Sequence, residues 1–80
     1  YPLPSGVFKS GSTNKAAIKQ IQNALRAVNF NCGTADGIYG AKTKDAVRRF
    51  QMLYLPYAVD GIYGPNTKSK LQAVLKSKSY

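Results

Sequence analysis

Asp36-Gly37-Ile38-Tyr39-Gly40 recurs, letter for letter, as Asp60-Gly61-Ile62-Tyr63-Gly64, 24 residues further along the chain. After two positions that differ, the agreement resumes in Thr43-Lys44 and Thr67-Lys68. A period of this length is typical of a supersecondary unit that occurs more than once. The sequence therefore predicts two copies of one unit, a turn followed by the opening of a helix.

The residue types in each pentapeptide predict its local structure. Asp accepts a hydrogen bond from the backbone two residues on, and the Gly after it supplies a positive φ, so Asp-Gly predicts a tight turn. Ile and Tyr predict a short apolar peg that enters the core, and the closing Gly predicts a permissive hinge. Tyr39 and Tyr63 occupy matched positions, so both are expected to be half buried against a helix, with the hydroxyl facing water or a backbone partner.

Apolar residues recur at helical spacing in three segments. The first helix is expected over residues 14–28, behind the candidate N-caps Ser12-Thr13-Asn14, and the second over residues 41–53, before Pro56. Pro65 is expected to open the third helix, since proline is favoured at the first helical position. The residues expected to face the core are Ile18, Ile21, Leu25, Val28, Ala46, Val47, Phe50, either Leu53 or Tyr54, Leu71, Val74 and Leu75.

These segments predict an all-α fold, a small three-helix bundle in which two turn-helix repeats pack on an N-terminal helix. Residues 1–13 are interpreted as a linker or N-terminal lead-in, with Val7 and Phe8 docking on the core. Residues 14–80 are interpreted as one domain, which fits the single economical core of a chain of 80 residues. The chain is expected to be a monomer.

The charge balance predicts an anionic partner. Twelve Lys and Arg against three acidic residues give a formal net charge of +9, and two readings stay open, a broad solvated basic surface or a polyanion site. No helix-turn-helix or RNA-binding signature is present, so nucleic acid is not expected as the partner. No apolar run approaches the ~18–20 residues of a membrane span. Cys32 permits no internal disulfide, and is interpreted as an inert, partly buried thiol, with intermolecular oxidation as the alternative.

The residue types also argue against catalysis. The sequence has no His and no Glu, so its carboxylates are Asp36, Asp45 and Asp60. Asp36 and Asp60 each precede Gly, where a turn accounts for them, and they are not expected to form a hydrolytic pair. A single Cys and scattered Asp provide no metal site, and no phosphate-binding or dinucleotide motif is present. We expect no catalytic residue, metal or cofactor, and therefore a binding or structural module.

Taken together, these residues resemble the peptidoglycan-binding domain type 1 family, small three-helix modules of bacterial and phage cell-wall hydrolases. The resemblance covers roughly residues 14–75. It rests on both turns, on the IKQIQNAL segment of residues 18–25, and on Phe50-Gln51 between the repeats. Two departures are Ser10-Gly11-Ser12 before the first helix, and Tyr57-Ala58 where relatives have Gly-Leu.

The resemblance implies a non-catalytic module that tethers a peptidoglycan hydrolase, such as a phage or bacterial endolysin or an N-acetylmuramoyl-L-alanine amidase, to its substrate. It implies peptidoglycan as the partner, with anionic wall polymers as a further one, and a location in the bacterial cell wall or outside the cell. The same bundle occurs in the pro-segments of matrix metalloproteinases, so a protein-docking or propeptide role is the alternative. Such a pro-segment would carry a cysteine-switch motif, and Cys32 lacks that context.

The ligand is expected in a shallow groove between the repeats, closer to the second turn. The predicted centre is Asp60, Gly61, Ile62, Tyr63 and Thr67, with Tyr54 and Tyr57 at the edge and Lys68 nearby; the first turn, residues 36–40, is its counterpart. An equally weighted alternative is that these residues only build the fold. A site on the face of the first helix near residues 29–34 is the remaining possibility.

Overall fold

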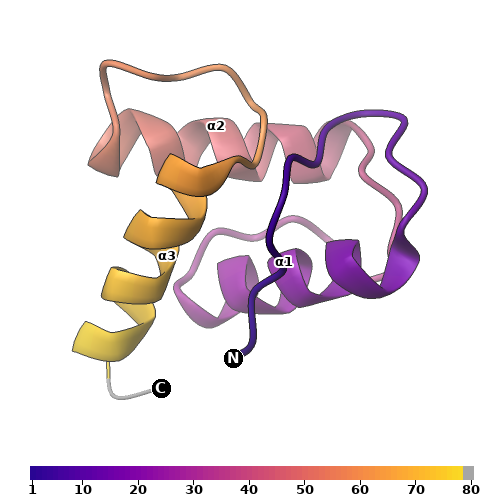
Figure 1. Cartoon of the computed structure of the whole chain (residues 1–80), viewed down its shortest axis with the longest axis horizontal. Helices are drawn as coiled ribbons and strands as arrows, with labels where there is room; N and C mark the ends of the chain where they lie inside the picture. The colour runs from indigo at the N-terminus through magenta and orange to yellow at the C-terminus, as the bar shows by residue number, and fades with distance from the viewer. Residues whose placement is uncertain (79–80) are drawn as a thin grey trace.

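Three helices make up the regular structure of the chain. A computed structural model describes residues 1–78 and contains α1 (Lys15–Ala27), α2 (Ala41–Tyr54) and α3 (Pro65–Ser77) (Figure 1). Helix α1 packs against both α2 and α3. Over residues 1–78 the β-structure is limited to an antiparallel bridge between Phe8 and Tyr63. The predicted all-α three-helix fold is confirmed; the domain boundary at residue 13 stays a prediction, and its end at residue 80 lies outside the described residues.

The helix ends follow from local chemistry. The Asn14 side chain accepts a hydrogen bond from the Ala17 amide at 3.2 Å, so the last of the three candidate caps is the one used. After α1, Asn29 takes a left-handed φ of 71° and turns the chain away from the helix axis. Helix α2 ends at Tyr54, shortly before Pro56, which cannot donate a helical hydrogen bond. Pro65 is the first residue of α3, as predicted.

The core lies where the three helices and the two turns meet. The predicted core residues are buried, with one choice settled: Leu53 is 64% exposed, whereas Tyr54 packs its ring 4.8 Å from that of Phe50. The prediction that Ile38 enters the core is wrong, because Ile38 is 58% exposed while Tyr39 is buried. Neighbouring side chains in non-helical backbone point to different sides, so burial of Tyr39 turns Ile38 outward.

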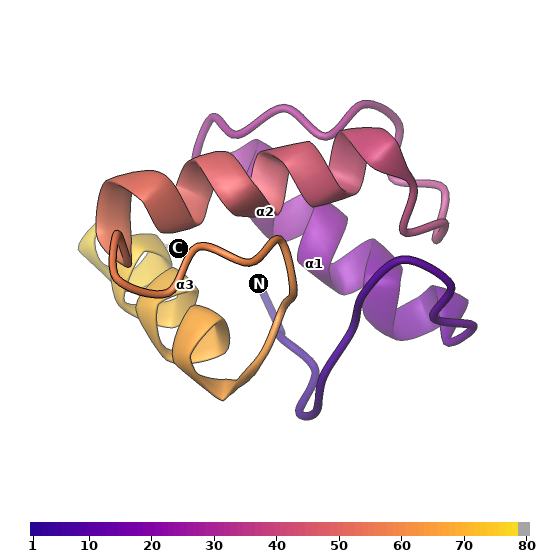
Figure 2. The ribbon, with the colours of Figure 1, turned by 90° about the horizontal axis from the view of Figure 1, so that it is seen from above.

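The segment before α1 packs on the second repeat. The amides of Phe8 and Tyr63 each donate to the other residue's carbonyl, at 2.8 and 2.9 Å. The side chains of Leu3 and Phe8 are partly buried against the core, which confirms docking of Phe8, whereas Val7 is 60% exposed and its predicted docking is wrong. Figure 2 shows this segment beside the connector that leads into α3. Residues 3–8 therefore cover the second turn.

Candidate functional site

A buried glutamine holds the second turn. Gln51, on the inner face of α2, is 1% exposed. Its Nε2 lies 2.9 Å from a carboxylate oxygen of Asp60, 3.0 Å from the carbonyl of Ile62 and 3.1 Å from the hydroxyl of Thr67. Its Oε1 accepts from the amides of Asp60 and Gly61 at 3.0 and 2.8 Å. One amide group thus supplies the donors and acceptors that the buried turn needs.

Gln22 on α1 does the same for the first turn. Its Nε2 lies 3.2 Å from Asp36, 2.9 Å from the carbonyl of Ile38 and 3.0 Å from the hydroxyl of Thr43. Its Oε1 accepts from the amide of Gly37 at 2.9 Å. Each repeat is therefore a glutamine on one helix, an Asp-Gly turn and a threonine on the next helix.

Sequence reasoning missed the role of the two glutamines. The signal was present, since Gln22 and Phe50-Gln51 belong to the segments on which the family resemblance rests. Gln22 and Gln51 are 29 residues apart, however, while the turns are 24 apart. The different connector lengths hide the glutamines from a search at one fixed period.

The four glycines of the two turns lie in two different kinds of environment. Gly37 and Gly61 have φ of 80° and 72°, and a Cβ on Gly37 would lie 3.0 Å from the carbonyl oxygen of Lys15, so the backbone requires glycine there. Gly40 and Gly64 have extended backbone that any residue can adopt, and no atom lies within 4 Å of a Cβ placed on either one. The interpretation of the closing glycine as a permissive hinge is therefore wrong. Gly40 and Gly64 therefore differ from Gly37 and Gly61 in having open space where a Cβ would lie, and not in needing a glycine conformation.

The turn tyrosines are core residues. Tyr39 and Tyr63 are 3% and 0% exposed, so the expectation of half-buried rings is wrong. Their hydroxyls do find backbone partners, because Tyr39 donates to the carbonyl of Gly61 and Tyr63 donates to that of Pro4, each at 2.8 Å. Desolvation raises the pKa of both phenols far above the ordinary value near 10. Tyr63 is not available to contact a ligand in this conformation.

Two related hollows lie at the starts of α2 and α3. The second-repeat hollow has a volume of about 270 Å³ and is lined by repeat residues Asp60, Ile62, Gly64, Pro65, Asn66 and Thr67, together with Val7, Gln51, Leu55 and Ala58. The first-repeat hollow, also about 270 Å³, is lined by the equivalent residues Asp36, Ile38, Gly40, Ala41, Lys42 and Thr43, together with Cys32 and Thr34. The repeat in the sequence therefore produces a repeated concave surface.

The structure divides the predicted ligand-binding residues into groups. Asp60, Ile62 and Thr67 line the second-repeat hollow. Gly61 lies beside it, in a smaller hollow with Lys9 and Lys44. The remaining residues lie apart from this hollow. Tyr57 lines a neighbouring hollow, and Tyr63 is in the core. Tyr54 packs its ring against those of Phe30 and Phe50, and Lys68 donates to the Ser5 hydroxyl at 2.9 Å.

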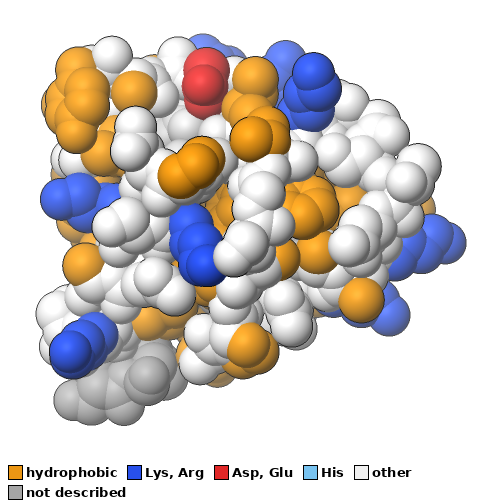
Figure 3. Space-filling view, in the orientation of Figure 1, with side chains coloured by type: hydrophobic (Ala, Val, Ile, Leu, Met, Phe, Trp, Pro, Cys, Tyr) orange, Lys and Arg blue, Asp and Glu red, His pale blue; other side chains and the backbone are white. Residues whose placement is uncertain are grey.

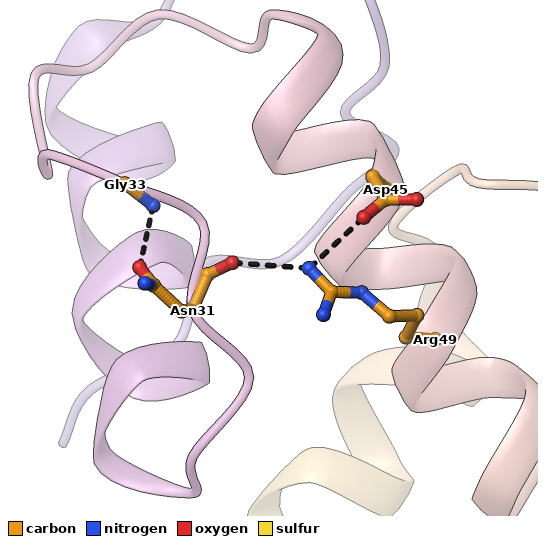
Figure 4. Close-up of polar contacts among 4 residues, drawn as sticks. All are labelled: Asn31, Gly33, Asp45 and Arg49. Atoms are coloured by element: carbon orange, nitrogen blue, oxygen red, sulfur yellow. Dashed lines mark hydrogen bonds and ion pairs between the residues drawn. The ribbon is translucent and has the colours of Figure 1, made fainter.

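The alternative location near residues 29–34 is a braced loop. Arg49 on α2 forms an ion pair with Asp45 at 2.9 Å and also donates to the carbonyl of Asn31 at 3.3 Å (Figure 4). The Asn31 side chain accepts from the Gly33 amide at 2.8 Å. A hollow of about 290 Å³ lies beside this loop, lined by Arg26, Asn29 and Asn31. Arg49 thereby fastens the loop to α2.

All three carboxylates are engaged within the fold. Asp36 and Asp60 each accept from the amide two residues on, at 2.9 Å, and from a buried glutamine, while Asp45 pairs with Arg49. The hydrogen bonds from the Ile38 amide and Gln22 lower the pKa of Asp36. Among residues 1–78, no cluster of His, Cys, Asp or Glu could hold a metal ion.

Cys32 is 2% exposed, and its thiol lies 3.5 Å from the carbonyl of Gln22. Burial raises the pKa of this thiol and so disfavours the reactive thiolate. These observations support the interpretation of an inert thiol and disfavour intermolecular oxidation. The buried thiol is also poorly placed to block a metal site in another domain, as the propeptide alternative would require.

In the described part of the chain, each helix is too short or too polar to span a bilayer.

The sequence and the fold of this chain are similar to those of known proteins. The sequence model described as "Putative peptidoglycan binding domain" matches residues 14–71. The chain is 46% identical to the N-acetylmuramoyl-L-alanine amidase CwlL of Bacillus licheniformis and 51% identical to CwlA of Bacillus subtilis (strain 168), covering 95% of this chain in each case. The crystal structure of the SleB N-terminal domain superimposes with a TM-score of 0.79 at 30% identity, covering 91% of this chain and 99% of that domain.

The chain spans about a quarter of the length of these enzymes, 23% of CwlL and 30% of CwlA. The solved SleB domain, in contrast, is matched over almost its whole length. The region of similarity is therefore a domain-sized part of the larger proteins.

Proposed function

The chain belongs to the peptidoglycan-binding domain family, and we propose that it is the non-catalytic module of a larger cell-wall hydrolase. In this proposal the module binds peptidoglycan through the second-repeat hollow. The parent activity that the relatives favour is that of an N-acetylmuramoyl-L-alanine amidase. Because the chain matches only a part of those enzymes, their catalytic function belongs to the remainder of such proteins. The module places its parent at the cell wall, outside the cell.

Two features of the chain support a binding role without catalysis. The three carboxylates already serve the turns and an ion pair, which leaves no free acid–base pair. The net charge of +9 favours a polymer that carries carboxylates, and it extends the proposed partners to anionic wall polymers. The module acts as a monomer in this proposal.

Gly64 is the observation that carries the proposed site. Its backbone does not require glycine, and the space where a side chain would stand is empty and opens into the second-repeat hollow. A glycine with neither a conformational nor a packing reason is typical of a place where a ligand approaches the backbone closely. Asp60 and Asn66 beside it are exposed and present polar atoms, and the half-buried Ile62 presents apolar ones. Such a mixed lining suits a peptide or a sugar with polar substituents.

Sedimentation with purified peptidoglycan sacculi, scored beside a turbidity assay, tests the function. We expect the chain to sediment with the sacculi and to leave their turbidity unchanged. A chain that stays in the supernatant would refute wall binding. Lysis by this chain alone would refute a purely binding role.

A matched pair of variants tests the site. Gly64→Asn places a side chain in the second-repeat hollow, and Asn is a favoured N-cap, so the stability of α3 should be retained. We expect this variant to lose most of its sacculus binding with an unchanged thermal transition. Gly40→Asn makes the same change in the first-repeat hollow, which lacks the apolar Val7 and Ala58 of the second, and should bind as the unmodified chain does. Equal binding by all three proteins would place the site elsewhere, with the hollow beside Asn29 as the next candidate.

A further inference from the structure

A second hollow adjoins the second-repeat hollow. We call it the α3 hollow; it has a volume of about 200 Å³ and is lined by Leu55, Tyr57, Asn66, Ser69, Lys70 and Ala73. Leu55 and Asn66 line both hollows, so the two lie side by side at these residues. A linear polymer bound in the first hollow would have the second as its next contact. The sequence-based site included Tyr57 but none of the α3 residues found here.

Tyr57 presents an unusually open aromatic ring. At 80% exposure it is the most exposed large hydrophobic side chain among residues 1–78. Leu55, two residues earlier, is buried, so the connector turns from a buried to an exposed side chain over these residues. Figure 3 shows hydrophobic side chains gathered over the end of α2 and this connector, with Lys or Arg side chains close by. An exposed ring beside a polar hollow is suited to stacking.

The α3 side of the hollow is a single polar helix face. Asn66, Ser69, Lys70 and Ala73 follow the spacing i, i+3, i+4 and i+7, which places them on one side of α3. They offer an amide, a hydroxyl, a cation and, at Ala73, a small side chain that leaves room. No acidic residue lines this hollow. Its charge therefore favours a ligand with a carboxylate.

These groups match a sugar better than a peptide. A pyranose ring has an apolar face that can lie on an aromatic ring, with hydroxyl and acetamido groups at its edge for an amide and a hydroxyl to bind. A peptide would need free backbone donors and acceptors for its own amides. On α3 the carbonyls of the lining residues accept helical hydrogen bonds, and of their amides only that of Asn66, in the first turn, has no helical acceptor. Apart from that amide, side chains make the contacts on this face, which favours a sugar.

We propose that the α3 hollow is a saccharide subsite for the glycan strand of peptidoglycan. Tyr57 stacks on an N-acetylated amino sugar, Asn66 and Ser69 bind its polar substituents, and Lys70 faces a sugar-linked carboxylate. This subsite rests on the proposed function and specifies which part of the wall polymer the module binds. The stem peptide is excluded from this subsite.

Nuclear magnetic resonance of the ¹⁵N-labelled chain tests the subsite with three soluble probes. These are glycan strands freed of peptide and carrying free carboxylates, an uncharged tetramer of N-acetylglucosamine, and the isolated stem peptide. We expect both glycan probes to shift the amide signals of Asn66, Ser69 and Lys70, and the stem peptide to leave them in place. Shifts caused by the stem peptide but not by glycan would overturn the proposal. So would the absence of any shift.

Four variants distinguish the contribution of ring stacking to glycan binding from the contribution of charge. Tyr57→Ala should weaken the binding of both glycan probes about two- to twelvefold, since a stacked ring contributes about 0.5–1.5 kcal/mol. Lys70→Ala should weaken the binding of the carboxylate-bearing strands and leave that of the uncharged tetramer unchanged. The controls Met52→Ala and Lys76→Ala remove an exposed apolar side chain and an exposed cation from outside the hollow, and should change nothing. All four residues are exposed or half-buried at the surface, so the fold should persist, which thermal unfolding verifies.

Sacculus sedimentation distinguishes failure of this subsite from failure of the proposed function. If the unmodified chain sediments with sacculi while glycan probes leave the α3 signals in place, wall binding stands and the saccharide subsite falls. If the chain does not sediment, the proposed function itself falls. Equal weakening by Tyr57→Ala and by Met52→Ala would also contradict a specific stacking role.

Discussion

The hydroxyl of Tyr39 donates a hydrogen bond to the carbonyl oxygen of Gly61 at 2.8 Å, so the first turn is fastened directly to the second. Both partners are buried. Since the amide of Gly61 is held by Gln51, both polar groups of this turn residue are satisfied inside the molecule. The two repeats are therefore coupled by a polar contact as well as by packing.

Removal of this hydroxyl should destabilise the fold. Tyr39→Phe leaves the Gly61 carbonyl buried without its donor, and we expect a loss of about 1–3 kcal/mol in the free energy of unfolding. Urea denaturation measures it. Tyr57→Phe removes the same group from an exposed ring and should cost almost nothing. An equal loss in both variants would mean that the contact between the turns contributes nothing specific.

Gln51→Glu should destabilise the chain at neutral pH. The substitution replaces a donor that lies 2.9 Å from Asp60 by a buried carboxylate, and breaking a buried polar arrangement in this way costs about 3 kcal/mol or more. Burial beside Asp60 should raise the pKa of the new carboxyl group, so acidification restores the donor and part of the stability. Thermal unfolding at pH 7 and pH 5 checks both effects. Gln72→Glu, on an exposed position of α3, is the control and should show neither.

Two glycines of the first turn should respond oppositely to serine. Gly37→Ser forces a side chain into a left-handed conformation against the backbone of Lys15, and we expect a cost of about 1–3 kcal/mol. Gly40→Ser has extended backbone and open space, and serine is a good N-cap for α2, so the change should be neutral or stabilise by up to about 1 kcal/mol. Urea midpoints of the two variants measure the difference. Similar losses at both positions would contradict the division of the glycines into two kinds.

Alkaline pH should weaken the fold through the buried tyrosines. The folded state raises the pKa of Tyr39 and Tyr63, so above the unfolded-state value of about 10 the unfolded chain loses protons that the folded chain retains. Stability from these groups is fully present below about pH 10 and falls as the pH rises further. Unfolding midpoints at pH 8 and pH 11 measure the loss. The comparison is with Tyr39→Phe, which lacks one of the two buried phenols and should lose less than the unmodified chain.

Salt should reduce wall binding only in part. Exposed charges separated by more than the Debye length, ~8 Å at physiological ionic strength, are largely screened. The aromatic and polar contacts of the proposed site are not, so we expect sacculus binding to weaken by a limited factor between low and physiological salt. Sedimentation across a salt series measures it. Complete loss near physiological salt, or equal affinity for DNA, would indicate a general polyanion binder instead.

The sequence predicted the helices and turns well because their determinants are local. Asn14 caps α1, Pro65 opens α3, and the Asp-Gly pairs form turns through contacts within two residues. The candidate site was harder to predict. Asp60, Ile62 and Thr67 were placed together, but the hollow they line also includes Gly64 and Asn66, which only their position at the start of α3 reveals.

The sequence by itself determined the three helices and the doubled turn, and it contains no His and no Glu. Tertiary structure alone decided which of two adjacent apolar residues faces the core: Tyr39 is buried and Ile38 exposed, and Tyr54 is half-buried and Leu53 exposed. It also decided that Tyr63 is a core residue, because the segment that covers it lies 59 residues earlier in the chain, where the carbonyl of Pro4 accepts a hydrogen bond from the Tyr63 hydroxyl. The physical reason is that backbone conformation depends on nearby residues, whereas burial depends on segments that meet only after the chain has folded.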